Sequence, residues 1–394
     1  MPLNFVCLPW LNKKDPHMIS SQKHLFDIPD DVSYLNTAYM SPLMNSVVQA
    51  IDEGARLKAQ PWKLKISHFF DDVDKARALF AKLVNASSKS VAIIPSASYG
   101  LTTAALNLPL AEGQTILALK HQFPSHTYPW KKRARESGGI FQEVDFQDGF
   151  SATESVLDAI DERTAVAALP NVLWTNGALV DLAKIRLRCD EVGAALVLDL
   201  TQSAGAMVTD FAKISPDFAV VANYKWMLGP YSTGFLYVAE RYLDGRPLEE
   251  GWITRKGGRN FSNLTENSEE FEAGAVRYDM GERANFALMP GVVCALEQLL
   301  AWGVDSIQTT LGMRNKDLCE RLDGLGLKTT RHDLRGPHFI GARIPDGTRN
   351  DLLDILARRQ IFLSQRNQAL RITPHLWNDQ GDFDRLIHAL SEIL

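Results

Sequence analysis

Short apolar runs rich in β-branched residues alternate with amphipathic stretches between about residues 90 and 240. This alternation is typical of a parallel sheet whose two faces are covered by helices. Stretches such as residues 153–160 and 181–192 carry apolar residues at helical spacing and are predicted helices. The predicted strands are residues 90–95, 115–120, 141–146, 164–170, 194–200, 218–223 and 234–238. The pattern therefore predicts an α/β fold with a large, mostly parallel seven-stranded sheet.

The chain beyond this region follows a different pattern. Residues 251–285 are rich in Gly, Arg, Asn and Glu with little periodicity, which predicts a long, functional excursion from the sheet. The elements predicted after it are a helix at 291–302, a strand at 338–344, a helix at 351–359, a hairpin at 361–372 and a last helix at 383–394. These elements predict a small α+β C-terminal domain. The expected organisation is an N-terminal segment that packs with the small domain, a large domain and the small domain, at residues 1–45, 46–285 and 286–394.

Composition and charge exclude several classes of protein. The 394 residues are 45% hydrophobic and 23% charged, which is ordinary for a globular chain. A net charge of −5 gives no support for nucleic-acid binding. Cys7, Cys189, Cys294 and Cys319 are too scattered for a disulfide framework or a metal site. No apolar run reaches the roughly 18 residues of a membrane span, and the apolar opening at 5–10 lacks a basic flank, so we expect a cytoplasmic protein without membrane partners.

Two polar residues follow consecutive predicted strands. Lys225 lies just after one strand, where burial would lower the pKa of its amine and make it a nucleophile for a carbonyl, although a surface lysine is the commoner explanation of one such residue. Asp199 closes the preceding apolar strand and, taken alone, fits a helix N-cap as well as a functional carboxylate. Together they match what pyridoxal 5′-phosphate requires. The lysine holds the aldehyde as a Schiff base, and the acid keeps the pyridine nitrogen protonated.

Other predicted strand ends carry groups that suit the same cofactor. Ser98 precedes a helix at 101–106, whose N-terminus offers backbone donors to a phosphate, although a plain serine cap also explains this pattern. Phe123 could stack on a flat ring or be a core aromatic residue. Asn171 could bind a ring hydroxyl or form a turn. The serine segment lacks the glycines of a P-loop or dinucleotide motif, and no nucleophile elbow is present.

Taken in order, these segments resemble the class V aminotransferase family of fold-type I pyridoxal phosphate enzymes, which includes cysteine desulfurases, kynureninases and isopenicillin N epimerase-like proteins. The resemblance runs from Tyr-Leu-Asn-Thr-Ala at 34–38, through Asn-Tyr-Lys-Trp-Met-Leu-Gly-Pro at 223–230, to Arg371. It implies that Lys225 is the Schiff base lysine and Asp199 the partner of the pyridine nitrogen. The other implied cofactor contacts are Ser98 and Tyr224 at the phosphate, Phe123 stacked on the ring, and Gln202 and Asn171 beside its hydroxyl.

The resemblance also assigns a substrate group and a partner. Arg371 looks like the family's arginine for the substrate carboxylate, and a planar guanidinium suits that role because it binds a carboxylate through two parallel hydrogen bonds. A surface salt bridge is the other explanation. Asn285 resembles the segment that reaches the phosphate of a neighbouring subunit, which implies a homodimer with shared active sites.

Two positions differ from the desulfurase pattern. Ala222 stands where desulfurases carry a phosphate-binding serine, so the phosphate must be anchored differently. No cysteine lies between Gly336 and Arg371, where a desulfurase carries its persulfide-forming thiol. Cysteine desulfuration is therefore not expected as the main activity.

The expected function is that of an enzyme that binds an amino acid to pyridoxal 5′-phosphate as an external aldimine and removes its Cα proton to give a carbanion. Transamination is the favoured reaction. Epimerisation and kynureninase-like Cβ cleavage share this first step, so they remain alternatives. A non-catalytic ligand-binding protein on the same fold is the alternative from another class, and the joint presence of Lys225, Asp199 and Arg371 argues against it.

Overall fold

The computed structural model describes residues 17–146, 150–266 and 268–394, so the apolar opening at 5–10 and Cys7 lie outside the described residues. The α-helices of this part are α1 (Asn45–Lys58), α2 (Asp71–Leu83), α3 (Ala97–Asn107), α4 (Pro124–Ser137), α5 (Ala152–Ala159), α6 (Leu182–Val192), α7 (Phe211–Ile214), α8 (Met289–Trp302), α9 (Val304–Gly324), α10 (Leu352–Arg358) and α11 (Gln380–Ile393). The strands are β1 (Ser33–Tyr34), β2 (Val91–Ile94), β3 (Thr115–Leu119), β4 (Ile140–Val144), β5 (Thr164–Pro170), β6 (Ala195–Asp199), β7 (Phe218–Ala222), β8 (Gly234–Val238), β9 (Lys328–Thr329), β10 (Ile340–Arg343), β11 (Ile361–Phe362), β12 (Ser364–Arg366) and β13 (Ala369–Ile372).

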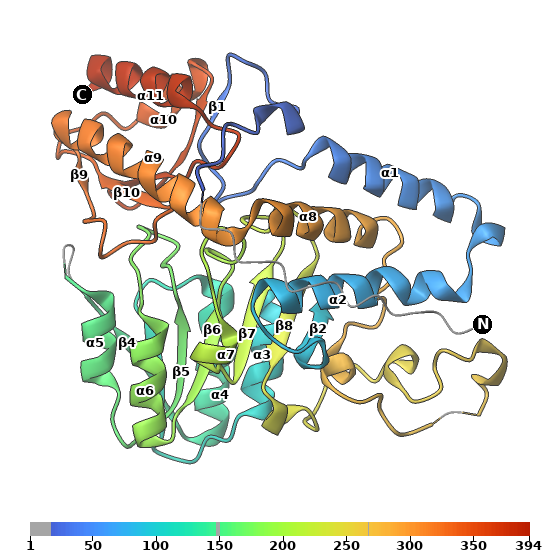
Figure 1. Cartoon of the computed structure of the whole chain (residues 1–394). Coiled ribbons are helices and arrows are strands. Elements are labelled where there is room, and N and C mark those ends of the chain that lie inside the picture. The colour runs from blue at the N-terminus through green and yellow to red at the C-terminus, as the bar shows by residue number, and fades with distance from the viewer. Residues whose placement is uncertain (1–16, 147–149, 267) are drawn as a thin grey trace.

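The large sheet has the strand order β2-β8-β7-β6-β5-β3-β4. Strand β8 is antiparallel to both of its neighbours, while the other paired strands run parallel. This confirms the predicted mostly parallel seven-stranded sheet, with strand limits that match the predicted ones or differ from them by at most two residues. Figure 1 shows helices around this sheet and a separate group formed by α9, α10 and α11 near the C-terminus.

Both faces of the large sheet are buried. Along β2, Val91 and Ile93 face a core formed with α2, α5, α6 and α8, while Ala92 and Ile94 face a second core formed with α3 and α4. Successive side chains of a strand point to opposite faces, so a strand that is apolar throughout supplies both cores. This explains why the strands read as continuous apolar runs in the sequence.

The C-terminal unit contains an antiparallel sheet of order β12-β13-β10-β9, packed on α9, α10 and α11 around a core of its own. The predicted hairpin at 361–372 is only partly correct. Strands β12 and β13 form the hairpin, but β11 pairs in parallel with β1. The N-terminal strand therefore lies on the C-terminal unit. The domain limits at 45 and 285 stay predictions.

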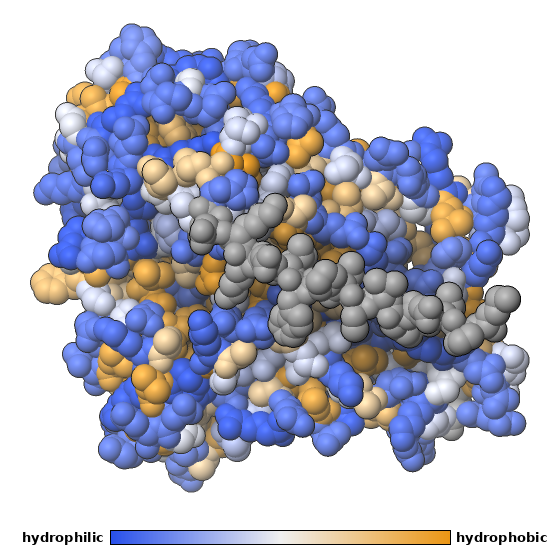
Figure 2. All heavy atoms as spheres, viewed as in Figure 1, coloured by the Kyte–Doolittle hydropathy of each residue, from blue (hydrophilic) through white to orange (hydrophobic). Residues whose placement is uncertain are grey.

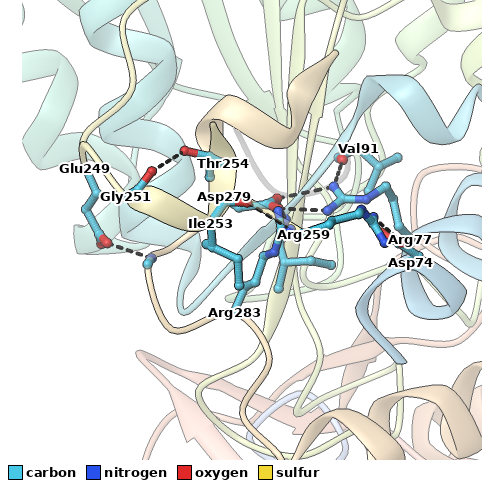
Figure 3. Close-up of polar contacts among 12 residues, drawn as sticks. Asp74, Arg77, Val91, Glu249, Gly251, Ile253, Thr254, Arg259, Asp279 and Arg283 are labelled. Atoms are coloured by element: carbon cyan, nitrogen blue, oxygen red, sulfur yellow. Dashed lines mark hydrogen bonds and ion pairs between the residues drawn. The ribbon is translucent and has the colours of Figure 1, made fainter. Parts of the chain in front are cut away.

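The excursion at 251–285 is tied to the edge of the large sheet by a buried carboxylate. Asp279 accepts hydrogen bonds from Arg77 Nη2 at 2.8 Å, from the backbone N–H of Ile93 at 2.7 Å and from Arg283. Figure 3 shows the guanidinium groups of Arg77 and Arg283 converging on this carboxylate. Because Ile93 belongs to β2, the network holds the excursion against the strand that leads into α3.

Hydrophobic residues are interspersed with hydrophilic ones on the face of the molecule shown in Figure 2. Within the described residues, no helix combines the length and apolar character needed to cross a lipid bilayer.

The turns that follow β6 and β7 touch each other. Gly205, in the turn after β6, has φ +91°, and a Cβ atom at this position would lie 2.4 Å from the backbone oxygen of Trp226. Gly193, after α6, has φ +76°, but an added Cβ would meet nothing within 4 Å. Gly205 therefore allows a close backbone contact beside Lys225, whereas Gly193 only adopts a left-handed conformation.

This difference predicts unequal effects of the same substitution. Gly193→Ala is expected to destabilise the fold by about 1–2 kcal/mol, the cost of a left-handed alanine. Gly205→Ala is expected to add about 1–3 kcal/mol of overpacking to that cost. Thermal melting followed by circular dichroism should therefore show a clearly lower Tm for Gly205→Ala than for Gly193→Ala. Equal melting temperatures would contradict the close contact.

Candidate active site

A cavity of about 280 Å³ lies at the carboxyl ends of β2, β5, β6 and β7. Parallel α/β sheets bind their ligands at this edge. The sequence-predicted residues that line the cavity are Ser98, Phe123, Asp199, Gln202, Tyr224 and Lys225. Ala222, the position that departs from the desulfurase pattern, lines it as well.

Lys225 lies in a tight turn directly after β7. The turn is closed by Asn223, whose carbonyl accepts the N–H of Gly229 at 2.9 Å and whose side-chain amide donates to Thr233 at 3.0 Å. Leu228 completes this turn in the left-handed region of the backbone, with φ 54°. Burial, followed by the charges of Arg371 and Arg366, lowers the pKa of Lys225 to about 8, although the charge of Asp199 acts in the opposite direction. The amine is therefore partly neutral near physiological pH.

Asp199 ends β6 and is held as a carboxylate. One oxygen accepts the backbone N–H of Thr201 at 3.1 Å, and the other lies 3.7 Å from Nδ1 of His126. Burial by itself would raise the pKa of Asp199, but His126 and Thr201 outweigh it and the pKa is lowered. At 3.7 Å the contact is longer than an ordinary hydrogen bond. The negative charge that a pyridine nitrogen would need is therefore kept at neutral pH.

The N-terminus of α3 forms another wall. Ser96 caps the helix by accepting the N–H of Tyr99 at 3.2 Å, and its hydroxyl lies 2.9 Å from that of Ser98. Ser96, Ala97 and Ser98 all line the cavity. Because first-turn amides have no partner inside the helix, this end offers backbone donors to an anion such as a phosphate.

Aromatic rings flank the lysine. The amine of Lys225 lies 5.7 Å from the ring centroid of Phe123 and 5.5 Å from that of Tyr224. Phe123 meets Trp174 edge-on at 5.4 Å, and Tyr224 is tilted against Tyr231 at 4.6 Å. The Phe123 side chain has space for a flat partner because 39% of its surface is exposed.

Gln202 joins the cavity to more distant parts of the chain. Its side-chain amide donates to the carbonyl of Ala38 at 3.1 Å and accepts from the indole N–H of Trp226 at 3.0 Å. Its backbone carbonyl accepts from Nε2 of His338 at 2.6 Å. The residue therefore links the N-terminal segment, the lysine turn and the C-terminal unit.

Arg371, on β13, is a buried cation without an acidic partner in the described part of the chain. Its Nε donates to the Ser364 hydroxyl at 2.9 Å and its Nη1 to the carbonyl of Trp174 at 2.9 Å. Ser364 in turn donates to the side chain of Asn36 at 2.9 Å. The Nη2 atom is buried without a hydrogen-bond partner. Burial and the charge of Arg366 lower the pKa of this guanidinium, which leaves a group suited to receive a carboxylate.

Besides Arg371, two further predicted residues, Asn171 and Asn285, lie outside the cavity lining. Asn171 is buried, and its side-chain oxygen accepts from the hydroxyl of Ser203. Asn285 lies on the surface, where its side chain accepts the N–H of Leu288 at 3.2 Å. The structure therefore gives both side chains partners within the chain, and their predicted cofactor roles stay predictions.

Sequence reasoning did not find His126, Thr201 or Trp174. His126 faces Asp199 from the first turns of α4, and the three-residue interval from Phe123 was the available signal, because residues so spaced lie on one side of a helix. Thr201 follows the strand end by two residues and lines the cavity. Trp174 carried no usable signal, since its contact with Arg371 spans 197 residues of sequence.

The model of the family Aminotransferase class-V matches residues 33–375. The chain belongs to the class V aminotransferase family. An uncharacterized aminotransferase of Bacillus subtilis, YcbU, is 24% identical over 385 residues, which span 96% of this chain and 98% of that protein. A probable cysteine desulfurase of Methanothermobacter thermautotrophicus is 25% identical, over 93% of this chain and 96% of the relative. A kynureninase of Geobacillus thermodenitrificans is 28% identical, over 64% and 61% of the two chains.

Solved structures share the fold of this class V chain. A mutant of C-DES with glycine covalently linked to the PLP cofactor superposes with a TM-score of 0.85 at 18% identity, over 95% of this chain and all (100%) of the other. The apo cysteine desulfurase of Thermococcus onnurineus NA1 gives a TM-score of 0.82 at 18% identity, over 95% and 98% of the two chains. This likeness confirms fold-type I architecture.

Pyridoxal 5′-phosphate is the cofactor of the class V family, and the residues of the cavity fit it. Lys225 offers a buried amine with a lowered pKa, and the charge of Asp199 is stabilised at the other side. The first turn of α3 faces the same space with backbone and hydroxyl donors. These three groups match the aldehyde, the pyridine nitrogen and the phosphate.

Removal of a negative or of a positive charge near Lys225 is predicted to shift its pKa in opposite directions. In the cofactor-free protein, labelling of Lys225 by an aldehyde and cyanoborohydride should rise with pH through a midpoint near 8. Asp199→Asn removes a negative charge that stabilises the ammonium form, so the midpoint should fall. Arg371→Gln removes a positive charge that opposes it, so the midpoint should rise. Peptide mass spectrometry, with exposed Lys184 as the internal rate reference, measures both shifts; a midpoint near the ordinary lysine value of about 10.4 in all three proteins would contradict the burial of the amine.

Proposed function

We propose that this class V enzyme is an aminotransferase that binds the α-carboxylate of an amino acid at Arg371. The observation that carries the proposal is the position of that buried arginine: it has a partnerless Nη2 and lies close enough to Lys225 for its charge to lower the pKa of the amine. A buried cation without a counterion is unfavourable unless a ligand supplies one.

Other arginines offer weaker anchors for a substrate. In the excursion, Arg255 forms an ion pair with Glu250, Arg277 with Asp244 and Arg283 with Asp279. Each of these groups already has its carboxylate within the chain. The contrast supports Arg371 as the substrate arginine.

The residues around the cavity suit a single-base mechanism. The chemistry that the cofactor supplies is an electron sink for the electron pair left on the substrate Cα. Asp199 holds its negative charge, and burial raises the pKa of Tyr224 to about 12, so Tyr224 keeps its proton. Lys225 is the buried group lining the described cavity whose pKa, about 8, suits proton exchange near neutrality. One base that takes a proton from one carbon and returns it to another supports transamination over epimerisation, which uses groups on both faces of the substrate.

The homodimer and the cytoplasmic location are part of the same proposal. Asn285 lies on the surface, where a second subunit could approach it. This position is compatible with a residue that completes the site of a neighbouring chain. Sedimentation analysis of the purified protein tests the dimer.

Product analysis tests the reaction. The purified enzyme with its cofactor is incubated with single amino acids, with and without a 2-oxo acid, and the products are separated by chromatography and mass spectrometry. We expect a new 2-oxo acid and a new amino acid in equal amounts, formed only when both substrates are present. Formation of alanine from kynurenine, or of sulfide from cysteine, as the main product would replace the proposal with Cβ cleavage or desulfuration. A Lys225→Ala control should abolish the reaction.

Arg371→Lys is expected to keep the fold and cofactor absorbance but to lose on the order of tenfold or more in kcat/KM. The ammonium is a point charge and lacks the fork that orients a carboxylate, and tenfold corresponds to about 1.4 kcal/mol. Steady-state kinetics and melting curves measure both properties. Turnover at the parent rate in Arg371→Lys and Arg371→Ala would show that the carboxylate binds elsewhere.

A further inference from the structure

A second arginine lies beside Arg371 on the same hairpin. Arg366 ends β12, and its guanidinium lies 5.3 Å from the ring centroid of Trp174, while that of Arg371 lies 5.7 Å from the same ring. Both guanidinium groups therefore lie near the same indole ring, that of Trp174, which lines the cavity. An indole face favours a cation but does not neutralise it.

The charge of Arg366 has no acidic partner in the described ranges. Its Nη1 donates a hydrogen bond to the backbone carbonyl of Gln365 at 2.7 Å. Other arginines of the C-terminal unit are paired: Arg321 with Asp384, Arg349 with Asp351, Arg359 with Glu392 and Arg385 with Asp382. Arg366 thus differs from these four arginines, each of which has a carboxylate partner.

The two free cations act on each other and on the lysine. The charge of Arg366 lowers the pKa of Arg371 and also that of Lys225. Such mutual repulsion between half-buried and buried cations is unfavourable in the free protein and is relieved when an anion binds between or beside them. The α-carboxylate of a substrate would neutralise one of the two charges. A second anionic group is needed for the other.

Arg366 lines a second hollow, of about 410 Å³. It is lined by Lys120, His121, Asn176 and Arg343 among others, and the carboxylate of Asp145 in its wall is paired with Lys120. The carbonyl of His121 accepts the indole N–H of Trp174 at 2.7 Å, which joins the walls of the two spaces. Arg366 therefore lines this hollow, and Trp174 joins it to the cavity of Lys225 through its contacts with Arg366 and His121.

From this arrangement we infer that the substrates of the enzyme carry a second carboxylate, and that Arg366 binds it while Arg371 binds the first. The inference rests on the proposed aminotransferase function and assigns its substrate class: amino acids with an acidic side chain and the corresponding dicarboxylic 2-oxo acids. Arg366 acts as a specificity residue, because an isosteric neutral side chain would leave its charge unpaired.

Isosteric substrate pairs test the inference directly. We expect kcat/KM for glutamate or aspartate to exceed that for glutamine or asparagine by tenfold or more in the parent enzyme. Arg366→Gln should reduce this acid-to-amide ratio at least tenfold. Arg349→Gln removes a charge from the same unit away from the cavity and should leave the ratio at the parent value. A parent ratio near one, or a ratio that Arg366→Gln does not change, would overturn the inference.

Binding without turnover separates this inference from the proposed function. Isothermal titration of the cofactor-loaded protein with glutarate and with butyrate should show at least tenfold tighter binding of the dicarboxylate, and Arg366→Gln should remove that preference. Selective glutarate binding without amino-group transfer would retain the dicarboxylate site and reject the aminotransferase. Transfer with no preference for glutarate would retain the aminotransferase and reject the role of Arg366. If Arg366→Gln has a much lower Tm than the parent, Arg366→Lys is used in the same titration. This variant keeps a positive charge and should keep part of the preference for glutarate.

Discussion

The parallel pairing of β6 with β7 is the constraint on which the site depends. It places Asp199 opposite Val220, two residues before β7 ends, so the acid and the lysine turn leave the sheet at the same edge. The turns after the two strands then touch at Gly205, where backbone atoms approach more closely than a side chain would allow. Because backbone hydrogen bonds set this register, the two charged groups are held in place by the most rigid part of the fold.

At this edge of the sheet, the side chains around the cavity supply more positive than negative charge. Lys225, Arg371 and Arg366 supply positive charge, and Asp199 is the acid whose charge raises the pKa of the lysine. In a partly buried cavity charges interact strongly, so this arrangement favours an anion over a cation as its ligand. The same excess of positive charge keeps the amine of Lys225 reactive, because each neighbouring cation favours the neutral form of that amine.

The C-terminal unit belongs to the site through a chain of hydrogen bonds. Asn36 binds Ser364, Ser364 binds Arg371, and Arg371 binds the carbonyl of Trp174 in the turn that follows β5. The parallel pairing of β1 with β11 brings the N-terminal segment to the same place. The segment between Gly336 and Arg371, which lacks a cysteine, thus holds a serine whose hydroxyl accepts a hydrogen bond from Nε of Arg371.

The sequence by itself determined the large sheet and the two strand-end residues Lys225 and Asp199, because apolar runs and the residues that follow them are local properties. It misjudged β11, whose partner is strand β1 rather than its neighbour in sequence, since apolar alternation does not encode which strand pairs with which. Only the tertiary structure decided that His126 faces Asp199 and that Arg366, Arg371 and Trp174 converge. Those contacts join residues from different elements, and their strength comes from burial, which arises only when the elements pack.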